Sequence, residues 1–197
     1  MRASTRREFV AGPAGRIECA VDEPEGGLRG VALIAHPHPL YGGTLDNKVV
    51  QTLARAFVEL GYQTWRPNFR GVGETEGAHD EGRGELEDLH AVVDHLKPER
   101  LVLAGFSFGA ALQAQLAQRV KAERLVLVGV GVTRLQTPGV PLDSLVIHGE
   151  SDETVPLAAV LDWARPQELP VVLVPGADHF FHRKLHVLRS IVQSNWK

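Results

Sequence analysis

Ser107 is surrounded by the residue types that a nucleophilic serine requires. It is the centre of the string G-F-S-F-G, residues 105–109, directly after the apolar run 101–104 and directly before the alanine-rich segment 110–120. A nucleophile elbow has this strand–turn–helix context, with small residues beside a strained serine. The N-terminus of the following helix favours negative charge that develops near the serine. The alternative interpretation is a glycine-rich turn that binds nothing.

A serine hydroxyl is a weak nucleophile at neutral pH, so it needs a base, and the base needs a carboxylate that orients it. His179 follows the apolar run 171–174 and could accept the serine proton. Two acids, Glu150 and Asp152, follow the run 145–148. Either could hold the imidazole in the required tautomer, so the residues alone leave this choice open.

Apolar runs predict the strands that would position these groups. Continuous runs are typical of strands covered on both faces, and the chain has five, at 31–35, 101–104, 125–130, 145–148 and 171–174, with a weaker strand at 63–66. Residues 9–11 and 17–21 predict an antiparallel pair around the turn 12–15.

Helical patterns separate the strands. Apolar residues repeat at three-to-four spacing in 49–60, which Gly61 ends, and in 86–96, with Pro98 just beyond. Further helices are expected at 110–120, after Val155-Pro156, and over 181–192, where Phe181 begins the apolar face.

The alternation of strands and helices predicts an α/β fold: a doubly wound, mostly parallel sheet in a single domain, residues 1–197. Active sites of such sheets lie at the carboxyl ends of the strands. Ser107, Asp152 and His179 each follow a strand, so the sequence predicts that they meet at one edge of the sheet.

Five motifs together resemble the α/β-hydrolase superfamily, in particular its small dienelactone-hydrolase-like group of serine hydrolases. They are residues 36–43 with Asp46-Asn47-Lys48, the string 68–73, the Ser107 elbow, the Asp152 loop and the His179 loop. The resemblance runs from Phe9 to the final helix. It implies the α/β-hydrolase fold and a Ser107–His179–Asp152 triad, with Asp152 rather than Glu150 as the acid. The order serine, acid, histidine is that of this superfamily.

The resemblance also indicates the oxyanion hole. One N–H comes from the residue after the nucleophile, Phe108, and the other from the loop 36–43. Pro37 and Pro39 have no N–H, so the second donor is expected to be His38 or Leu40, with a later residue of the loop as the less favoured alternative. Tyr41 and Phe106 are expected to line the substrate pocket.

The sequence differs from dienelactone hydrolase at the nucleophile, which is serine here and cysteine there. It therefore implies cleavage of ordinary esters or thioesters, through an acyl-enzyme intermediate, rather than lactone opening. Residues 131–143 are too few to build a helical lid or cap domain, so an open site and small acyl groups are expected.

Composition gives no sign of other partners. The formal net charge is −3 and 44% of residues are hydrophobic, so neither nucleic acid nor membrane is expected to bind. The apolar run 125–132 is too short to cross a bilayer, and no secretory signal is recognised behind Met1. The single cysteine, Cys19, cannot form an intrachain disulfide, which fits a cytoplasmic protein. No cofactor is expected, and the oligomeric state is not readable.

Two other functions are compatible with parts of the sequence. A metal-dependent hydrolase could use the histidine pairs His36/His38 and His182/His186 with Asp178, although no recognised ligand motif is present. A catalytically silent binding protein could share the fold, because a fold does not imply a function. A complete triad favours an enzyme over the silent binding protein.

Overall fold

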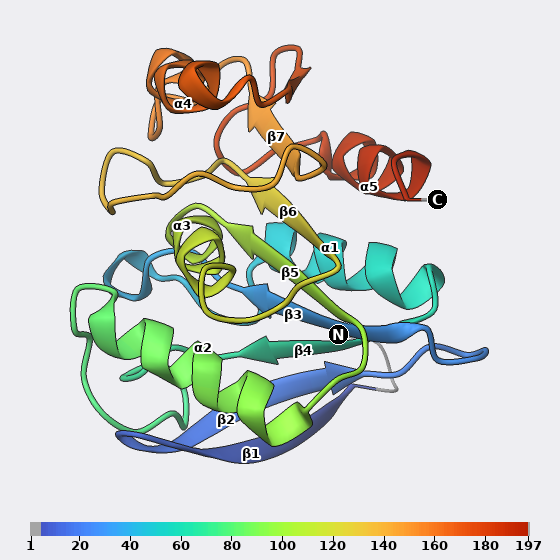
Figure 1. The fold of residues 1–197 in the computed structure, drawn as a ribbon, viewed down its shortest axis with the longest axis vertical. Helices are drawn as coiled ribbons and strands as arrows, with labels where there is room; N and C mark the ends of the chain where they lie inside the picture. Colours follow the sequence, from blue (N-terminus) through green and yellow to red (C-terminus); the bar gives the residue numbers. More distant parts are fainter. Residues whose placement is uncertain (1–4, 197) are drawn as a thin grey trace.

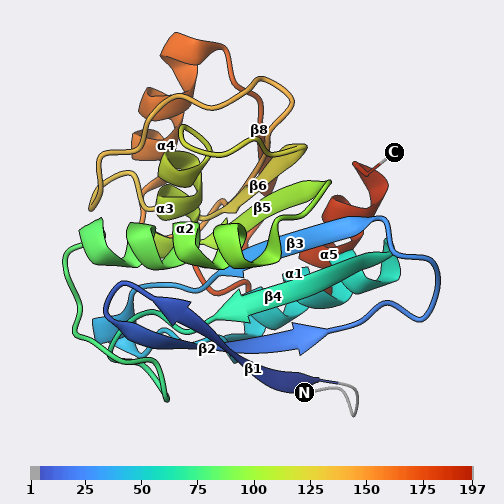
Figure 2. The same ribbon diagram turned by 60° about the horizontal axis from the view of Figure 1, so that its bottom comes forward.

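The computed structural model describes residues 5–196 and shows one eight-stranded sheet with helices on both faces (Figures 1 and 2). The strand order is β1-β2-β4-β3-β5-β6-β7-β8. Strands β3 to β8 run parallel to one another, and only β2 runs against its neighbours. The predicted fold class is confirmed. The strands are β1 (Arg6–Gly12), β2 (Gly15–Asp22), β3 (Gly30–Ala35), β4 (Tyr62–Pro67), β5 (Leu101–Phe106), β6 (Arg124–Val128), β7 (Leu145–Gly149) and β8 (Val171–Val174).

The sheet separates two apolar cores. Helices α2, α3 and α4 lie on one face and α1 and α5 on the other, as Figure 2 shows. Their apolar side chains pack into the two cores. The helices are α1 (Lys48–Glu59), α2 (Arg83–Leu96), α3 (Phe108–Leu116), α4 (Leu157–Ala164) and α5 (Leu185–Ser194), with 3-10 turns η1 (Pro39–Tyr41) and η2 (Arg165–Gln167). No helix within residues 5–196 is long and apolar enough to cross a membrane.

Helix α3 is fixed to the centre of the sheet by a buried amide. The side chain of Gln113 donates hydrogen bonds to the carbonyls of Leu33 and Ala104, each at 3.0 Å. These carbonyls belong to the adjacent parallel strands β3 and β5. The helix that carries Ser107 at its start is therefore tied to two strands at once.

Two helices differ from the sequence-based expectation. Helix α3 ends at Leu116 rather than 120, because the N–H groups of Gln118 and Arg119 bond three residues back and turn the chain toward β6. Helix α5 begins only at Leu185. Phe181 lies before it, fully buried and with a φ of 54°. His182 also precedes the helix, so His182 and His186 do not share a helical face.

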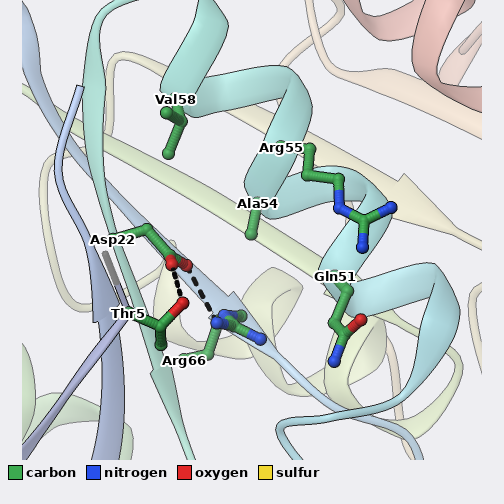
Figure 3. A pocket seen from close by; sticks show the side chains of 7 residues that line it. All are labelled: Thr5, Asp22, Gln51, Ala54, Arg55, Val58 and Arg66. Carbon is green, nitrogen blue, oxygen red and sulfur yellow. Dashed lines mark hydrogen bonds and ion pairs between the residues drawn. The ribbon is translucent and has the colours of Figure 1, made fainter. Parts of the chain in front are cut away.

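Two of the buried residues of the antiparallel strand β2 are Cys19 and Asp22. Cys19, the only cysteine of the chain, is fully buried, and this burial raises the pKa of its thiol to about 12. Asp22 forms an ion pair of 2.8 Å with Arg66 of β4. Figure 3 shows Asp22 between Thr5 and Arg66, beside α1. The cavity there measures about 20 Å³, which is room for one water molecule.

Candidate active site

Ser107 lies in the sharp turn between β5 and α3, with φ 55° and ψ −115°. A Cβ on Gly105 would lie 2.6 Å from the backbone of Gly109, and a Cβ on Gly109 would lie 2.5 Å from the carbonyl oxygen of Ala35. Neither position can carry a side chain without a backbone shift. The two glycines therefore allow the turn, as a nucleophile elbow requires.

The structure brings the three triad candidates together. The Ser107 hydroxyl lies 3.0 Å from Nε2 of His179, and Nδ1 of His179 lies 2.6 Å from Oδ2 of Asp152. An ionised carboxylate only accepts, so Nδ1–H donates to Asp152 and Nε2 is left to accept the serine proton. His179 and Asp152 are buried, whereas Ser107 is partly exposed.

The Asp152 carboxylate is held by its own loop. Its Oδ1 accepts hydrogen bonds from the N–H groups of Thr154 at 2.9 Å and Val155 at 2.8 Å, which leaves Oδ2 for the imidazole. Glu150 is exposed and accepts from the N–H of Gly176 at 2.7 Å. The geometry thus favours Asp152 over Glu150 as the acid.

The loop after β3 contributes one N–H beside the elbow. Residues 39–41 form the turn η1, and the N–H of Leu40 donates to Nδ1 of His38 at 3.3 Å. Leu40 itself is mostly exposed. The expectation that Leu40 serves the oxyanion hole is therefore not met, because its N–H is used inside its own turn.

His38 and Phe108 are better placed as oxyanion donors. Their rings pack with centroids 4.7 Å apart, and within residues 5–196 neither N–H donates to another group of the chain. Phe108 is the first residue of α3, where the N–H groups have no partner inside the helix. The close contact of Gly109 with the carbonyls of Ala35 and His36 brings these two segments together.

An open cleft of about 270 Å³ lies in front of Ser107. Between β6 and β7, residues 129–144 form neither helix nor strand, so no lid covers it. Tyr41 is in its wall, as expected. The other residues that line it are Pro37, His38, Gly42, Gly43, Asn47, Phe108, Gly131, Arg134, Thr154, Val155, His179 and Phe180.

Phe106 does not line the cleft, contrary to expectation. It is fully buried on the α1–α5 side of the sheet, and its ring packs on that of His179 with centroids 4.8 Å apart. Side chains alternate along a strand, and Phe106 ends β5 pointing toward the core. It supports the imidazole from below instead of contacting a ligand.

The family described as "alpha/beta hydrolase fold" matches residues 38–140, slightly more than half of the chain. The chain belongs to the α/β-hydrolase fold family. A serine hydrolase homologue from Coxiella burnetii is 38% identical, with a TM-score of 0.87 over 98% of this chain and 97% of that one. A serine hydrolase without lid from Xanthomonas campestris is 37% identical, with a TM-score of 0.90 over 99% and 94%. An uncharacterized protein of Rickettsia prowazekii is 32% identical over 89% of this chain and 82% of its own length.

His148 is a residue of this α/β-hydrolase that the sequence did not single out. It is fully buried at the end of β7, with Nε2 3.0 Å from the carbonyl of Val155 and 3.6 Å from Oδ2 of Asp152. Burial lowers the pKa of His148, while the charge of Asp152 opposes this shift. A neutral His148 leaves the charge of Asp152 to His179.

His36 has a structural role at the site that sequence reasoning also missed. Its Nδ1–H donates to the carbonyl of Pro37 at 2.6 Å, and its Nε2 accepts from the N–H of Phe69 at 2.9 Å. Burial lowers its pKa to about 3. Both ring nitrogens are thus used to join the loops after β3 and β4, so His36 and His38 do not offer a shared metal site.

The other metal candidates do not gather either. His182 is exposed and bonds through Nδ1 to Asp178 at 2.6 Å, outside the helix that carries His186. Within residues 5–196 no group of three or more histidine, cysteine or acidic side chains could hold a metal ion.

Arg70, in the loop after β4, holds Asp88 of α2 through two hydrogen bonds of 2.7 and 2.8 Å, which fixes this loop.

Proposed function

We propose that this α/β-hydrolase cleaves small carboxylic esters or thioesters through an acyl-enzyme intermediate. The observation that carries the proposal is the aligned pair of contacts, Ser107 to His179 at 3.0 Å and His179 to Asp152 at 2.6 Å. A nucleophile, a base and the acid that orients the base are the minimum set for acyl transfer by a serine. Membership of a family with serine hydrolase homologues supports the same conclusion.

The first half of the reaction forms the acyl-enzyme. The Ser107 oxygen attacks the carbonyl carbon of the substrate while Nε2 of His179 takes its proton, and Asp152 stabilises the imidazolium. The negative charge on the carbonyl oxygen is stabilised by the N–H groups of Phe108 and His38. When the tetrahedral intermediate breaks down, His179 donates the proton to the leaving alcohol or thiol.

The second half releases the acid. A water molecule takes the place of the leaving group, His179 removes one of its protons, and the resulting hydroxide attacks the acyl carbon. The bond to the Ser107 oxygen breaks, and the serine recovers its proton from His179. Water and the chain's own groups supply every atom and charge, so this chemistry requires no cofactor.

Replacement of Ser107 tests the proposal. The Ser107→Ala variant should lose hydrolysis of acyl esters by roughly 10⁶-fold, as expected when the nucleophile of a triad is removed. It should also lose covalent labelling by a fluorophosphonate probe. A circular dichroism spectrum should accompany both measurements, to show that the Ser107→Ala variant is folded.

Ser190→Ala is a matched control, because Ser190 is an exposed residue of α5 away from the cleft. It should retain wild-type labelling and turnover. Labelling that persists in Ser107→Ala would place the nucleophile elsewhere. A wild-type protein that is neither labelled nor active would indicate a silent binding protein, and activity that disappears with chelators would indicate a metal-dependent hydrolase.

A further inference from the structure

Arg134 places a permanent positive charge in the wall of the cleft and has no role in the proposed reaction. It lies in the turn after β6, where its N–H donates to the carbonyl of Gly131 at 3.1 Å. Gly131 packs directly on the peptide that joins Ser107 and Phe108, since a Cβ there would lie 3.2 Å from the Ser107 carbonyl. The turn therefore begins at Gly131, next to the nucleophile, and Arg134 follows three residues later in the wall of the same cleft.

Arg134 differs from most arginines of the described chain in what its guanidinium contacts. Most of them hold a carboxylate, as Arg70 holds Asp88 and Arg189 holds Glu59. Arg134 contacts no carboxylate of residues 5–196 within salt-bridge distance. Its guanidinium carbon lies 4.9 Å from the ring centre of Tyr41, and Nη1 donates a long hydrogen bond of 3.4 Å to the Tyr41 hydroxyl.

Contact with Tyr41 orients this cation. A guanidinium that stacks on an aromatic ring uses its face. Apart from the Nη1–H that reaches the Tyr41 hydroxyl, the N–H donors at the edge of Arg134 have no partner within residues 5–196. Those donors form a planar fork that matches the two oxygens of a carboxylate. Because Tyr41 and Arg134 both line the cleft, the fork is available to a molecule bound in front of Ser107.

Glu81 and Glu85, whose charges act on His38, pair with His79 and not with Arg134. Glu85 is buried and holds His79 at 2.7 Å, and Glu81 is largely exposed and lies 3.7 Å from the other nitrogen of His79. Burial is the main cause that lowers the pKa of His38. The charges of His79 and Arg134 contribute in the same direction, and those of Glu81 and Glu85 oppose the shift.

The position of Arg134 distinguishes the two ends of a substrate. In the proposed reaction the leaving group lies beside His179, which donates a proton to it. Arg134 lies at the other end of a series of ring contacts: Phe108 to His38 at 4.7 Å, and His38 to Tyr41 at 4.8 Å. These contacts join Arg134 to Phe108 and His38, the proposed oxyanion donors, and not to His179, so we assign a group held by Arg134 to the acyl part of the substrate.

We propose that Arg134 binds a carboxylate at the far end of the acyl group, so that the preferred substrates are monoesters or monothioesters of short dicarboxylic acids. This inference rests on the proposed function, because it names the substrate class of the same site. Hydrolysis of such a substrate consumes one water and yields the dicarboxylic acid and the free alcohol or thiol.

The test compares two substrates of equal acyl length, monoethyl adipate and ethyl hexanoate, by ethanol release. In the wild type kcat/KM should favour the charged ester at least tenfold. Arg134→Gln should lower this preference by roughly 10- to 100-fold, the value of a hydrogen bond between charged groups. Arg134→Lys should recover only part of it, because an ammonium lacks the fork.

Arg165→Gln is the matched control. Arg165 is exposed outside the cleft and pairs with Asp162 at 2.7 Å, so its loss changes the net charge equally and should leave the preference unchanged. A second pair of substrates, carboxymethyl acetate and ethyl acetate, carries the charge on the alcohol instead. An Arg134-dependent preference within this pair would overturn the assignment to the acyl end.

Adipate binding separates this inference from the proposed function. Calorimetric titration of Ser107→Ala with adipate should show binding that weakens about tenfold when Arg134→Gln is added. Adipate binding that does not depend on Arg134 overturns the carboxylate site even if esters are cleaved. Adipate binding that does depend on it, without hydrolysis of any ester by the wild type, refutes the proposed function and keeps the carboxylate site.

Discussion

His36 and His179 lie at the same edge of the sheet and are both buried, yet only one of them is arranged for chemistry. The ring nitrogens of His36 bond to two backbone groups, the carbonyl of Pro37 and the N–H of Phe69. Those of His179 face two side chains, the carboxylate of Asp152 and the hydroxyl of Ser107. Phe106 packs on the ring of His179, and Phe69 packs on that of His36.

The difference lies in what a proton on each ring would meet. Burial lowers the pKa of His36 to about 3. A second proton on its ring would also face the N–H of Phe69, which needs an acceptor. A second proton on His179 would face the Ser107 oxygen from which it came, with the charge of Asp152 on the other side. The same residue type serves as a fixed connector or as a base, according to whether a carboxylate and a cleft adjoin it.

Among the tests of this comparison between the two histidines, the largest effect is expected from the carboxylate. Asp152→Asn should reduce kcat by roughly 10³- to 10⁴-fold, because an amide favours the wrong histidine tautomer and does not stabilise the imidazolium. Glu150→Gln is the matched control, and it should cost little because Glu150 bonds to the backbone of Gly176. Steady-state kinetics of the two variants decides between the acids. A larger loss in Glu150→Gln would move the acid to Glu150.

The second test addresses His36 as a connector. The pKa of His36 is about 3 in the folded chain, below its ordinary value of 6.5, so between these pH values the unfolded chain binds the extra proton. Stability is therefore lost as pH falls below 6.5, by slightly more than 1 kcal/mol per pH unit. The lowered pKa of His148 acts in the same direction.

His36→Asn should lower the free energy of unfolding at pH 7 by about 1–3 kcal/mol, since buried backbone groups lose a partner. It should also make the loss between pH 7 and pH 5 shallower than in the wild type. Urea unfolding at the two pH values measures both. His186→Asn, at an exposed position of α5, is the control. An unchanged pH slope in His36→Asn would show that His36 does not stay neutral.

The smallest effect concerns the space beside His179, which His36 lacks. The cleft of about 270 Å³ is open and has no lid, so it can bury only the first carbons of an acyl chain. Each buried methylene contributes about 0.8 kcal/mol, or roughly fourfold in kcat/KM. Nitrophenyl esters with about two to six acyl carbons should be cleaved best, with no further gain beyond them. A steady rise to twelve or more carbons would contradict an open site.

The sheet and the meeting of Ser107, Asp152 and His179 could be predicted because both depend on local patterns. Strands covered on both faces must be continuously apolar, and in a parallel sheet the residues that follow them meet at one edge. The apolar runs at 101–104, 145–148 and 171–174 coincide with β5, β7 and β8, so their order alone predicts that Ser107, Asp152 and His179 lie near one another. The cytoplasmic location and the identity of the substrate stay predictions.

Tyr41, His38 and Phe108 were named from the sequence, but the roles of His36, Leu40, Phe106 and Arg134 could not be predicted, because they depend on contacts between distant segments. His36 acquires its role from Phe69, which folding brings next to it. The N–H of Leu40 bonds within the turn that Pro39 begins, so it is not offered to a substrate. The side chain of Phe106 points into the core because of its position in β5, so it does not line the cleft. Arg134 lies in a turn without periodicity, so nothing in the sequence pointed it toward Tyr41.

The rate at which Cys19 is alkylated can report how often the sheet opens around β2. It is the single thiol of the chain and is fully buried within β2, between β1 and β4. Thiol reagents act on the exposed thiolate, so alkylation requires that β2 first separate from its neighbours. The rate at which one equivalent of label enters therefore measures how often the antiparallel side of the sheet opens. Inhibition by such reagents would follow that opening rate and not the chemistry at Ser107.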